Sequence, residues 1–562
     1  MRCKQCIFQE IPSAASPGND VRIEICPTCS VDECKISSSK GKKAVFNIEL
    51  ITTPIQRLIM ECFPVKIEWS EVFGRYLVAT RDIQQGELIF QIEPIISGPT
   101  PSYTEPEWLC MSCYKATKKK TMVRCSDCQW PFCSSECAED EVHQEYECLV
   151  LTRAKVLPEE NYQESITLMQ LLRCLLLKNK DPTGWQQIQS MESHVEGRKN
   201  SSNDVWERWR KEEIKFIRET LGLKEFDDEE INFVSGVLSM NAFGSNDIHG
   251  PKHRHGSYLY YLGAMASHDC SPNADYEVDA NQDFNLKASI DIPKGTQITL
   301  SYALPFQGTL LRREYLKDYF FDCCCNRCSD STEFGSYFSA LKCASCENGI
   351  LLPEYSLHEE SPWKCSETLC KGLKSVSEVS AHIKNFETLR ESPPYVIDTK
   401  NCLVNIENLE ELMEKGKPIF HPNHFCLMGV EFELINKLQY YLEIKQIPMS
   451  WNDRLLELTR KHIDIGQKIW HGWNDRYGRL LFMLQSGLLN SLSTKCQKDF
   501  GEKGEADTQR IIKDIMRVRN EAKNILLSKP SGSYENQLGL KLKLIMDKEA
   551  TEADLIERLK KL

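Results

Sequence analysis

Eight potential zinc ligands within a stretch of 39 residues constrain this chain more than any other feature. They follow the order C-x2-C, C-x2-C, C-x3-C, H and C, and they are Cys110, Cys113, Cys125, Cys128, Cys133, Cys137, His143 and Cys148. A structural zinc ion takes four thiolate or imidazole ligands in a tetrahedron. The block therefore predicts two zinc ions in a small module with too little core to fold without metal.

A second group of cysteines follows a polar turn. The turn reads S-H-D-C-S-P-N over residues 267–273, and a later segment reads F-D-C-C-C-N-R-C up to residue 328. Cys323, Cys325 and Cys328 are one ligand short of the tetrahedral set that zinc prefers. We expect Cys270 to be the fourth ligand, because it would tie this knot of cysteines to the turn.

Tyr302 ends a run of alternating residues between the turn and the knot. The run reads G-T-Q-I-T-L-S-Y, and Ile298, Leu300 and Tyr302 would face the same way in a strand. A strand that ends in this way can hold a phenol rigidly in a site.

The 26 cysteines include two further groups with metal-ligand spacing. One group follows the knot and favours a further zinc site: Cys343, Cys346, Cys365 and Cys370. The other lies at the N-terminus and is compatible with a small zinc ribbon, or with a poorly ordered tail that carries incidental cysteines: Cys3, Cys6, Cys26 and Cys29. Cysteines in C-x2-C pairs indicate metal rather than disulfides when the compartment is reducing.

Charge and hydropathy argue against two classes of function. The formal net charge of -12 disfavours broad nucleic-acid binding, which needs a basic face. Met1-Arg2-Cys3 opens no secretory signal, and the best apolar run, 168–177, is broken by Gln170 and Arg173. We therefore expect a soluble intracellular monomer, in the nucleus, the cytoplasm or both, with no membrane partner.

The turn, the tyrosine and the knot together resemble the SET domain of protein lysine methyltransferases. His268, Cys270, Pro272, Asn273 and Tyr302 match that pattern. Two positions depart from it, because a serine at position 267 and an aspartate at position 269 stand where the family usually has asparagine and serine.

The segment G-R-Y-L-V-A-T-R-D-I, residues 74–83, is similar to the opening of the SET domain. In that family a G-x-G turn passes close to S-adenosylmethionine and binds it through the backbone. Gly74 fits this turn, but Tyr76 replaces the second glycine. Tyr76 therefore either remodels the rim of the cofactor site or accompanies a different backbone.

The block of eight ligands resembles a MYND finger, whose ligands interleave. The resemblance implies one zinc ion on Cys110, Cys113, Cys133 and Cys137, and a second on Cys125, Cys128, His143 and Cys148. A MYND finger inserted into a SET domain is typical of the SMYD family, and G-R-Y-L-V-A and S-H-D-C resemble its arthropod branch, SmydA.

This resemblance implies an α+β fold. A β-rich SET fold would carry the finger and a helical insert, and a post-SET zinc module and an all-α, TPR-like C-terminal domain would follow. The expected parts are an uncertain Cys-rich segment (1–62), the first part of SET (63–105), the MYND finger (106–150), the helical insert (151–239), the SET core (240–303), the post-SET region (304–375) and the C-terminal helices (376–562).

The implied activity is S-adenosylmethionine-dependent methylation of a lysine on a histone or another protein, with a role in transcriptional regulation. Tyr302 would be the catalytic residue, and Tyr319 and Phe321 would line the lysine channel. The expected contacts with the cofactor are Gly74, Arg75, Tyr76, Asn241, Ser267, His268, Tyr302, Tyr319 and Phe321. The finger would bind proline-rich peptides or corepressors, and chromatin is a further expected partner.

A different class of function stays open. Ser267 and Tyr76 both fall at expected cofactor contacts, so the chain would also fit a catalytically weak or inactive SET–MYND scaffold that binds partner proteins. Tyr302, Asn241 and the complete set of knot cysteines favour the enzyme.

Overall fold

The structure is a computed structural model in which the chain forms two compact units. It describes residues 7–10, 22–25, 62–100, 108–200, 204–244, 255–395, 402–444, 447–496, 502–549, 551–552 and 554–555. Unit 1 comprises Met1–Ser267, Tyr276–Ile298 and Pro530–Tyr534. Unit 2 comprises His268–Asp275, Thr299–Lys529 and Glu535–Leu562.

In the N-terminal segment, 1–62, the structure describes a short hairpin and residue 62. Strand β1 (Ile7–Glu10) pairs antiparallel with β2 (Arg22–Ile25), and Ile7 lies opposite Ile25. The four cysteines of the expected N-terminal zinc site, Cys3, Cys6, Cys26 and Cys29, lie outside the described residues. That zinc site therefore stays a prediction.

Short antiparallel strands form the β-rich part of unit 1. β3 (Val65–Ser70) and β4 (Gly74–Ala79) make a hairpin, which buries Val65 against Ala79. β5 (Leu88–Ile92) pairs with β15 (Phe284–Ala288). β12 (Gly256–Leu259) lies between β6 (Ile96–Pro99) and β11 (Ala242–Gly244). Hydrogen bonds from Ala79 N to Thr296 O and from Ile298 N to Leu77 O, both 2.9 Å, join β4 to the segment before residue 299.

The finger is built from very short elements, which is typical of a module that relies on metal. Its strands are β7 (Trp108–Leu109), β8 (Ala116–Thr117), β9 (Val123–Arg124) and β10 (Pro131–Phe132). Its helices are α2 (Ser135–Ala138), α3 (Glu141–Glu145) and α4 (Cys148–Ala154). The side chains of Ser134 and Asp140 cap α2 and α3, and Trp130 and Phe132 are fully buried.

The residues between the finger and β11 are mostly helical, and we keep the name helical insert for them. It contains α5 (Pro158–Thr167), α6 (Met169–Lys180), α7 (Pro182–Gln189), α8 (Val195–Asn200), α9 (Asp204–Ile214), the π-helix η2 (Lys215–Thr220) and α10 (Asp228–Asn241). Leu171, Leu172 and Leu175 of α6 recur at helical spacing, and all three are buried.

Unit 2 begins with short elements around the knot of cysteines. They are β16 (Thr299–Leu300), α11 (Thr309–Leu316), η4 (Lys317–Tyr319) and α12 (Asn326–Ser329). A four-stranded antiparallel meander follows: β17 (Leu341–Lys342), β18 (Ile350–Pro353), β19 (Trp363–Cys365) and β20 (Leu373–Lys374). We call this meander the ribbon. Ser375 and Glu378 then form a capping box that starts α13 (Val376–Arg390).

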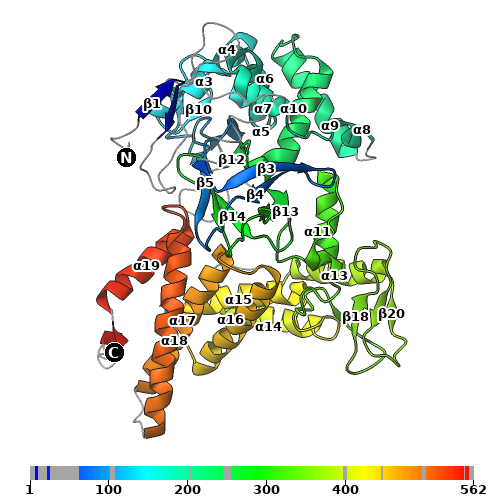
Figure 1. The fold of residues 1–562 in the computed structure, drawn as a ribbon, viewed down its shortest axis with the longest axis vertical. Coiled ribbons are helices and arrows are strands. Elements are labelled where there is room, and N and C mark those ends of the chain that lie inside the picture. The colour runs from blue at the N-terminus through cyan, green and yellow to red at the C-terminus, as the bar shows by residue number, and fades with distance from the viewer. Residues whose placement is uncertain are drawn as a thin grey trace. The chain divides into compact units, whose positions relative to one another are not determined.

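Long helices form the rest of unit 2 (Figure 1). They are α14 (Cys402–Gly416), α15 (Phe425–Ile444), α16 (Met449–Ile469), α17 (Asp475–Cys496), α18 (Glu502–Leu527) and α19 (Tyr534–Lys548). From α14 to α18 each helix packs against the next, over two apolar cores. Among the described residues, none of the helices is both long and apolar enough to cross a membrane. The predicted α+β class with a helical C-terminal region is confirmed.

Candidate functional site

The β3–β4 hairpin shows which backbone conformation Tyr76 adopts in place of the expected glycine. Gly74 has a φ of 62°, and a Cβ placed there would meet nothing within 4 Å, so the turn leaves open space beside its backbone. Tyr76 lies in β4 opposite Glu68, and it is not among the residues with positive φ. Its hydroxyl donates to Glu68 Oε2 at 3.2 Å. A tyrosine fits position 76 because the backbone there is an ordinary strand.

Two residues expected at the cofactor bind the same segment at the end of α7. The guanidinium of Arg75 donates to the carbonyl of Ser190 and, at 3.2 Å, to its hydroxyl and to the hydroxyl of Tyr261. Asn241, the last residue of α10, donates through Nδ2 to Glu192 O at 2.8 Å. In this structure both side chains hold the helical insert, so any contact that they make with a cofactor adds to this role.

The polar turn is held by its own side chains and by β16. Ser267 is the last residue of its segment in unit 1, and His268 starts unit 2. His268 Nδ1 lies 2.9 Å from the backbone N of Tyr302, and His268 Nε2 lies 3.2 Å from Cys270 Sγ. Asn273 Oδ1 accepts from the backbone N of Thr299 at 2.9 Å.

An aromatic group surrounds Tyr302 within unit 2. The ring centroid of Tyr302 lies 5.3 Å from those of His268 and Tyr319 and 6.4 Å from that of Phe321. Burial raises the pKa of the Tyr302 phenol, so the hydroxyl keeps its proton near neutral pH. The structure thus brings together four of the predicted site residues, whereas Gly74, Arg75, Tyr76, Asn241 and Ser267 belong to unit 1.

The strand that precedes Tyr302 is shorter than its alternation predicts. β16 covers only Thr299–Leu300, although Ile298 and Leu300 are both buried as expected. In the last backbone hydrogen bond of this stretch, Asp269 N donates to Leu300 O at 2.9 Å. The ladder ends there because the N–H of Tyr302 binds an imidazole instead of a strand carbonyl.

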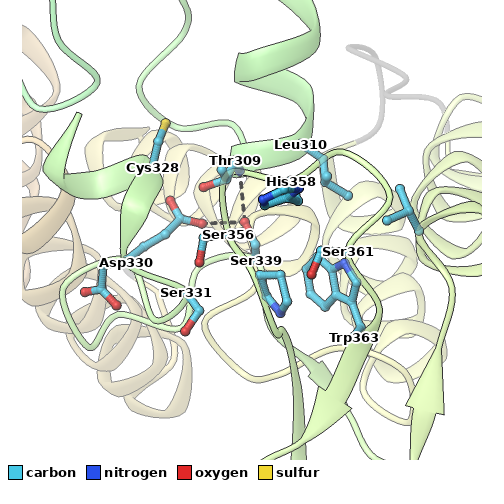
Figure 2. Close-up of a pocket in the computed structure, with 13 residues that line it drawn as sticks. Thr309, Leu310, Cys328, Asp330, Ser331, Ser339, Ser356, His358, Ser361 and Trp363 are labelled. Atoms are coloured by element: carbon cyan, nitrogen blue, oxygen red, sulfur yellow. Dashed lines mark hydrogen bonds between the residues drawn. The ribbon is translucent and has the colours of Figure 1, made fainter. Parts of the chain in front are cut away.

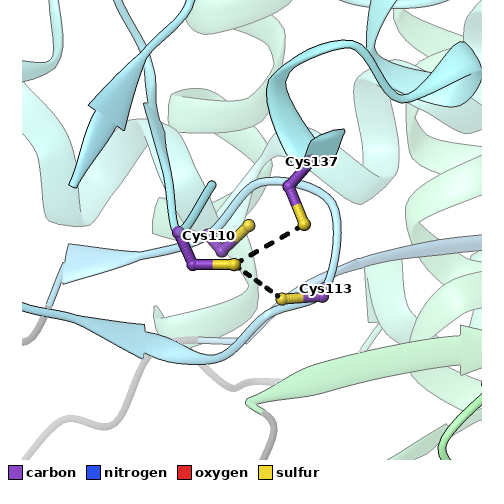
Figure 3. Close-up of side chains that lie close together, drawn as sticks. Cys110, Cys113 and Cys137 are labelled. Atoms are coloured by element: carbon purple, nitrogen blue, oxygen red, sulfur yellow. Dashed lines mark hydrogen bonds between the residues drawn. The ribbon is translucent and has the colours of Figure 1, made fainter. Parts of the chain in front are cut away.

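The eight ligands of the finger lie in two groups of four, in the interleaved arrangement. Within each group, all ligand atoms lie within 4.8 Å of one another. In the first group Cys133 Sγ is 3.5 Å from the sulfurs of Cys113 and Cys137, and Figure 3 shows the thiols of Cys110, Cys113 and Cys137 pointing toward one another. In the second group Cys125 Sγ is 3.6 Å from Cys148 Sγ.

These distances fit zinc and exclude disulfides. A tetrahedral ion with Zn–S bonds of about 2.3 Å spaces its sulfurs about 3.8 Å apart, whereas a disulfide needs about 2.05 Å. In the same way, Cys270 Sγ lies 3.9 Å from Cys323 Sγ and 3.5 Å from Cys328 Sγ. In the ribbon, the Cys343–Cys370 and Cys346–Cys365 sulfur pairs are each 3.6 Å apart.

Four Cys-rich clusters of the described chain can therefore hold zinc. The ligand groups are Cys110, Cys113, Cys133 and Cys137; Cys125, Cys128, His143 and Cys148; Cys270, Cys323, Cys325 and Cys328; and Cys343, Cys346, Cys365 and Cys370. We call them the outer finger, inner finger, knot and ribbon clusters. All four ligands of the inner finger cluster are buried, whereas two of the four ribbon ligands are partly exposed.

A buried carboxylate that the sequence analysis missed supports the inner finger cluster. Glu147 Oε1 lies 2.9 Å from His143 Nδ1, while His143 Nε2 lies 3.5 Å from Cys128 Sγ and so faces the metal position. Arg173 Nε donates to Glu147 Oε2 at 2.9 Å, and both residues are fully buried. Burial alone would raise the pKa of Glu147, but Arg173 and His143 hold it below its usual range. The i,i+4 spacing of His143 and Glu147 was the available signal.

Arg173 also joins the finger to other parts of unit 1. Its Nη1 donates to Ser97 O at 3.0 Å and to the Tyr114 hydroxyl at 2.9 Å, and its Nη2 donates to Met111 O at 2.9 Å. Arg173 lies in α6, Ser97 in β6, and the other two residues in the finger. One guanidinium thus links the finger, a strand and the helical insert.

The knot cluster has a comparable support in unit 2, which the sequence analysis also missed. Glu333 Oε2 accepts from Arg312 Nη1 at 3.0 Å and from Arg327 Nε at 2.8 Å, and all three residues are buried. Arg327 Nη1 donates to Cys270 O at 3.2 Å, and Arg312 Nη2 lies 3.7 Å from Cys328 Sγ. Two buried cations therefore lie beside a cluster of cysteine sulfurs and share one carboxylate.

A small pocket borders this network (Figure 2). Its lining includes Thr309, Ser339, Ser361 and Trp363, and the backbone N of Thr309 donates to Ser339 Oγ at 3.0 Å. The volume of about 20 Å³ has room for a water molecule and is far too small for a cofactor.

Comparison with known proteins agrees with these features. The SET domain family matches residues 74–303. The SET domain-containing protein SmydA-8, isoform A, of Drosophila melanogaster is 31% identical over 309 residues, which cover 53% of this chain and 63% of that protein. The histone-lysine N-methyltransferase Smyd1 of Mus musculus is 22% identical over 458 residues, 76% of this chain and 81% of the relative.

A SET and MYND domain-containing protein of Dictyostelium discoideum is 26% identical over 365 residues, 55% of this chain and 88% of the relative. The chain spans 63% of the length of the Drosophila relative. The SET match, the ligand clusters and these relatives together agree with the predicted resemblance: residues 74–303 match the SET domain family, and the chain is similar to proteins of the SMYD kind.

Proposed function

We propose that this chain is a protein-lysine N-methyltransferase that uses S-adenosylmethionine. The observation that carries the proposal is Tyr302, which lies near the end of the matched SET domain and is held by His268 within a group of aromatic rings. Relatives named histone-lysine N-methyltransferases support a protein lysine as the substrate, on a histone or on another protein.

The residues of this chain would each have a defined task. Bound S-adenosylmethionine would supply the methyl group. The open space at Gly74 fits a cofactor that approaches the backbone closely, and Tyr76, Asn241, Ser267 and His268 are the proposed further contacts. Arg75 of β4, which binds Ser190 of the helical insert, would complete the set.

Tyr302 and its neighbours would prepare the amine. A free lysine has a pKa of about 10.4, so its amine must lose a proton before it can react. An aromatic channel lined by Tyr319 and Phe321 disfavours the charged form because it removes water. The Tyr302 hydroxyl, whose pKa is raised by burial, keeps its proton and can orient the amine.

Calorimetric titration of S-adenosylmethionine into the zinc-loaded full chain tests this proposal. We expect binding by the parent and by Tyr302→Phe, and loss of methyl transfer to a lysine substrate only in the variant. Tyr355→Phe, at an exposed ribbon tyrosine, is the matched control and should keep the activity of the parent. Failure of the parent to bind the cofactor would reject the enzyme and leave a SET–MYND scaffold.

We also propose that the finger binds partner proteins, as proline-rich peptides or corepressors, in an intracellular role in transcription. Lys118, Lys119 and Lys120 are exposed in the turn between β8 and β9, and they would favour peptides that carry acidic residues. Titration with a labelled proline-rich peptide should show binding that a scrambled peptide lacks and that chelation abolishes. Equal binding of both peptides would reject this role.

A further inference from the structure

The imidazole of His268 has a partner on each ring nitrogen, and both partners belong to unit 2. The backbone N of Tyr302 lies 2.9 Å from Nδ1, and Cys270 Sγ lies 3.2 Å from Nε2. The ring also contacts the rings of Tyr302, at 5.3 Å, and Phe321, at 5.8 Å, between centroids. One side chain thus lies between a ligand of the knot cluster and the proposed catalytic tyrosine.

These two partners fix the tautomer of His268. A backbone N–H can only donate, so Nδ1 must present its lone pair to Tyr302. In the neutral ring the proton is then on Nε2, where it points at Cys270 Sγ. A metal-bound cysteine is a thiolate held at a fixed position, where it can accept this hydrogen bond.

The position of the sulfur that Nε2 contacts therefore depends on whether the knot cluster holds its metal. With metal bound, the Nε2–H bond to the Cys270 thiolate holds the ring in the orientation that accepts from Tyr302. Without metal, no ion fixes the position of the Cys270 sulfur, and the ring loses a partner of fixed position. The backbone of Tyr302 then loses a fixed partner at the point where β16 has already ended.

We propose that His268 is a positioning residue that links metal occupancy of the knot cluster to the position of Tyr302. This role differs from the cofactor contact expected from the sequence, because the side chain acts through Cys270 and Tyr302. Its consequence for catalysis rests on the proposed methyltransferase function, whereas its effects on the tautomer and on metal retention do not.

Two variants of His268 separate its bond to Tyr302 from its bond to Cys270. His268→Asn places an amide oxygen near the position of Nδ1, so it can still accept from Tyr302, but it removes the donor to Cys270. His268→Phe removes both bonds. His471→Phe is the matched control, because His471 Nδ1 binds the hydroxyl of Ser271 in the same turn, at 3.0 Å, without a bond to Cys270 or Tyr302 among those described.

Metal retention is the first readout. Native mass spectrometry of the full zinc-loaded chain during exposure to a chelator should show one metal per chain leaving about 10- to 100-fold faster in both His268 variants. His471→Phe should release metal like the parent. In methyl transfer, His268→Phe should lower kcat by up to about 100-fold. His268→Asn should lower it less.

Nitrogen NMR of histidine-labelled parent protein provides a readout that needs no variant. We expect the ring proton of His268 to lie on Nε2 in the zinc-loaded chain, and this fixed signature to be lost when the knot loses its metal. A proton on Nδ1, or parent-like metal release by His268→Phe, would overturn the link. If the parent neither binds the cofactor nor transfers methyl groups, the proposed function fails, and the tautomer and the release rates still decide whether the link exists.

Discussion

The finger and the C-terminal helices are stabilised by different means. The strands of the finger have two residues each and its helices four to seven, around two clusters of metal ligands. Helices α14 to α18 have 15 to 26 residues and pack over two large apolar cores. Metal coordination therefore replaces apolar burial where the chain is too short to build a core, and the two regions should fail under different treatments.

Removal of zinc should have the largest effect, and of these two regions it should unfold the finger and leave the C-terminal helices folded. We expect a strong chelator to unfold residues 108–154, because structural zinc supplies the folding free energy of such modules. Hydrogen exchange followed by mass spectrometry should show full loss of protection there and retained protection in α16 to α18. Equal loss of protection in both regions would show that the helices also depend on metal.

Truncation of the helical core should have the opposite pattern. Ile515 is fully buried in α18, and Ile515→Ala should destabilise this region by about 2–5 kcal/mol, because it leaves a cavity. Denaturant unfolding followed by the helical signal measures the loss, and zinc content should stay unchanged. Zinc loss in this variant would show that the two regions are coupled.

Acid should weaken the helices through a buried histidine. Burial, with Arg476 and Lys461 nearby, lowers the pKa of His462 from 6.5 to about 4, although Glu431 opposes this shift. As the pH falls from 6.5 toward 4, the unfolded chain takes up a proton that the folded chain refuses. Stability should therefore be complete above pH 6.5 and should fall by up to about 3 kcal/mol below it.

Hydrogen exchange of α16 at a series of pH values checks this expectation. His462→Gln keeps a donor for Glu431 and should flatten the dependence, while His358→Gln, at an exposed histidine, should not. An unchanged slope in His462→Gln would assign the acid sensitivity to another group.

The smallest expected effect concerns the support of the inner finger cluster. Glu147→Gln removes the carboxylate that orients His143, so zinc affinity should fall by about 10- to 100-fold. A competition titration with a zinc indicator measures the change. Glu230→Gln is the control. Glu230 of α10 forms an ion pair at the surface with Lys178 of α6, the helix that also carries Arg173. Equal affinities of Glu147→Gln and the control would show that His143 needs no orienting carboxylate.

The zinc ligands were easier to predict from the sequence than the buried charged residues that hold the ligands in place. Cysteine spacing indicated all four clusters of the described chain, because zinc restricts both the type and the number of its ligands. The buried pairs of Glu147 with Arg173 and of Glu333 with Arg312 escaped notice, since their members lie 26 and 21 residues apart and charged residues are usually exposed.

The backbone at two expected site residues was likewise decided by local pairing that no motif reveals. Tyr76 fits because β4 pairs residue by residue with β3, which leaves it in a strand conformation. The strand before Tyr302 stops early because an imidazole takes the N–H that a ladder would use. Both outcomes depend on contacts with particular partners rather than on residue type.

The separation of Cys270 from the rest of its cluster has a consequence during protein synthesis. Cys323 follows Cys270 by 53 residues and Cys328 follows it by 58. At roughly 5–20 residues per second, the ribosome adds the remaining ligands several seconds after Cys270. During this interval a nascent chain carries a thiol that has no partners, beside a turn that cannot yet take its final form. A pause in translation between these positions would prolong that exposure.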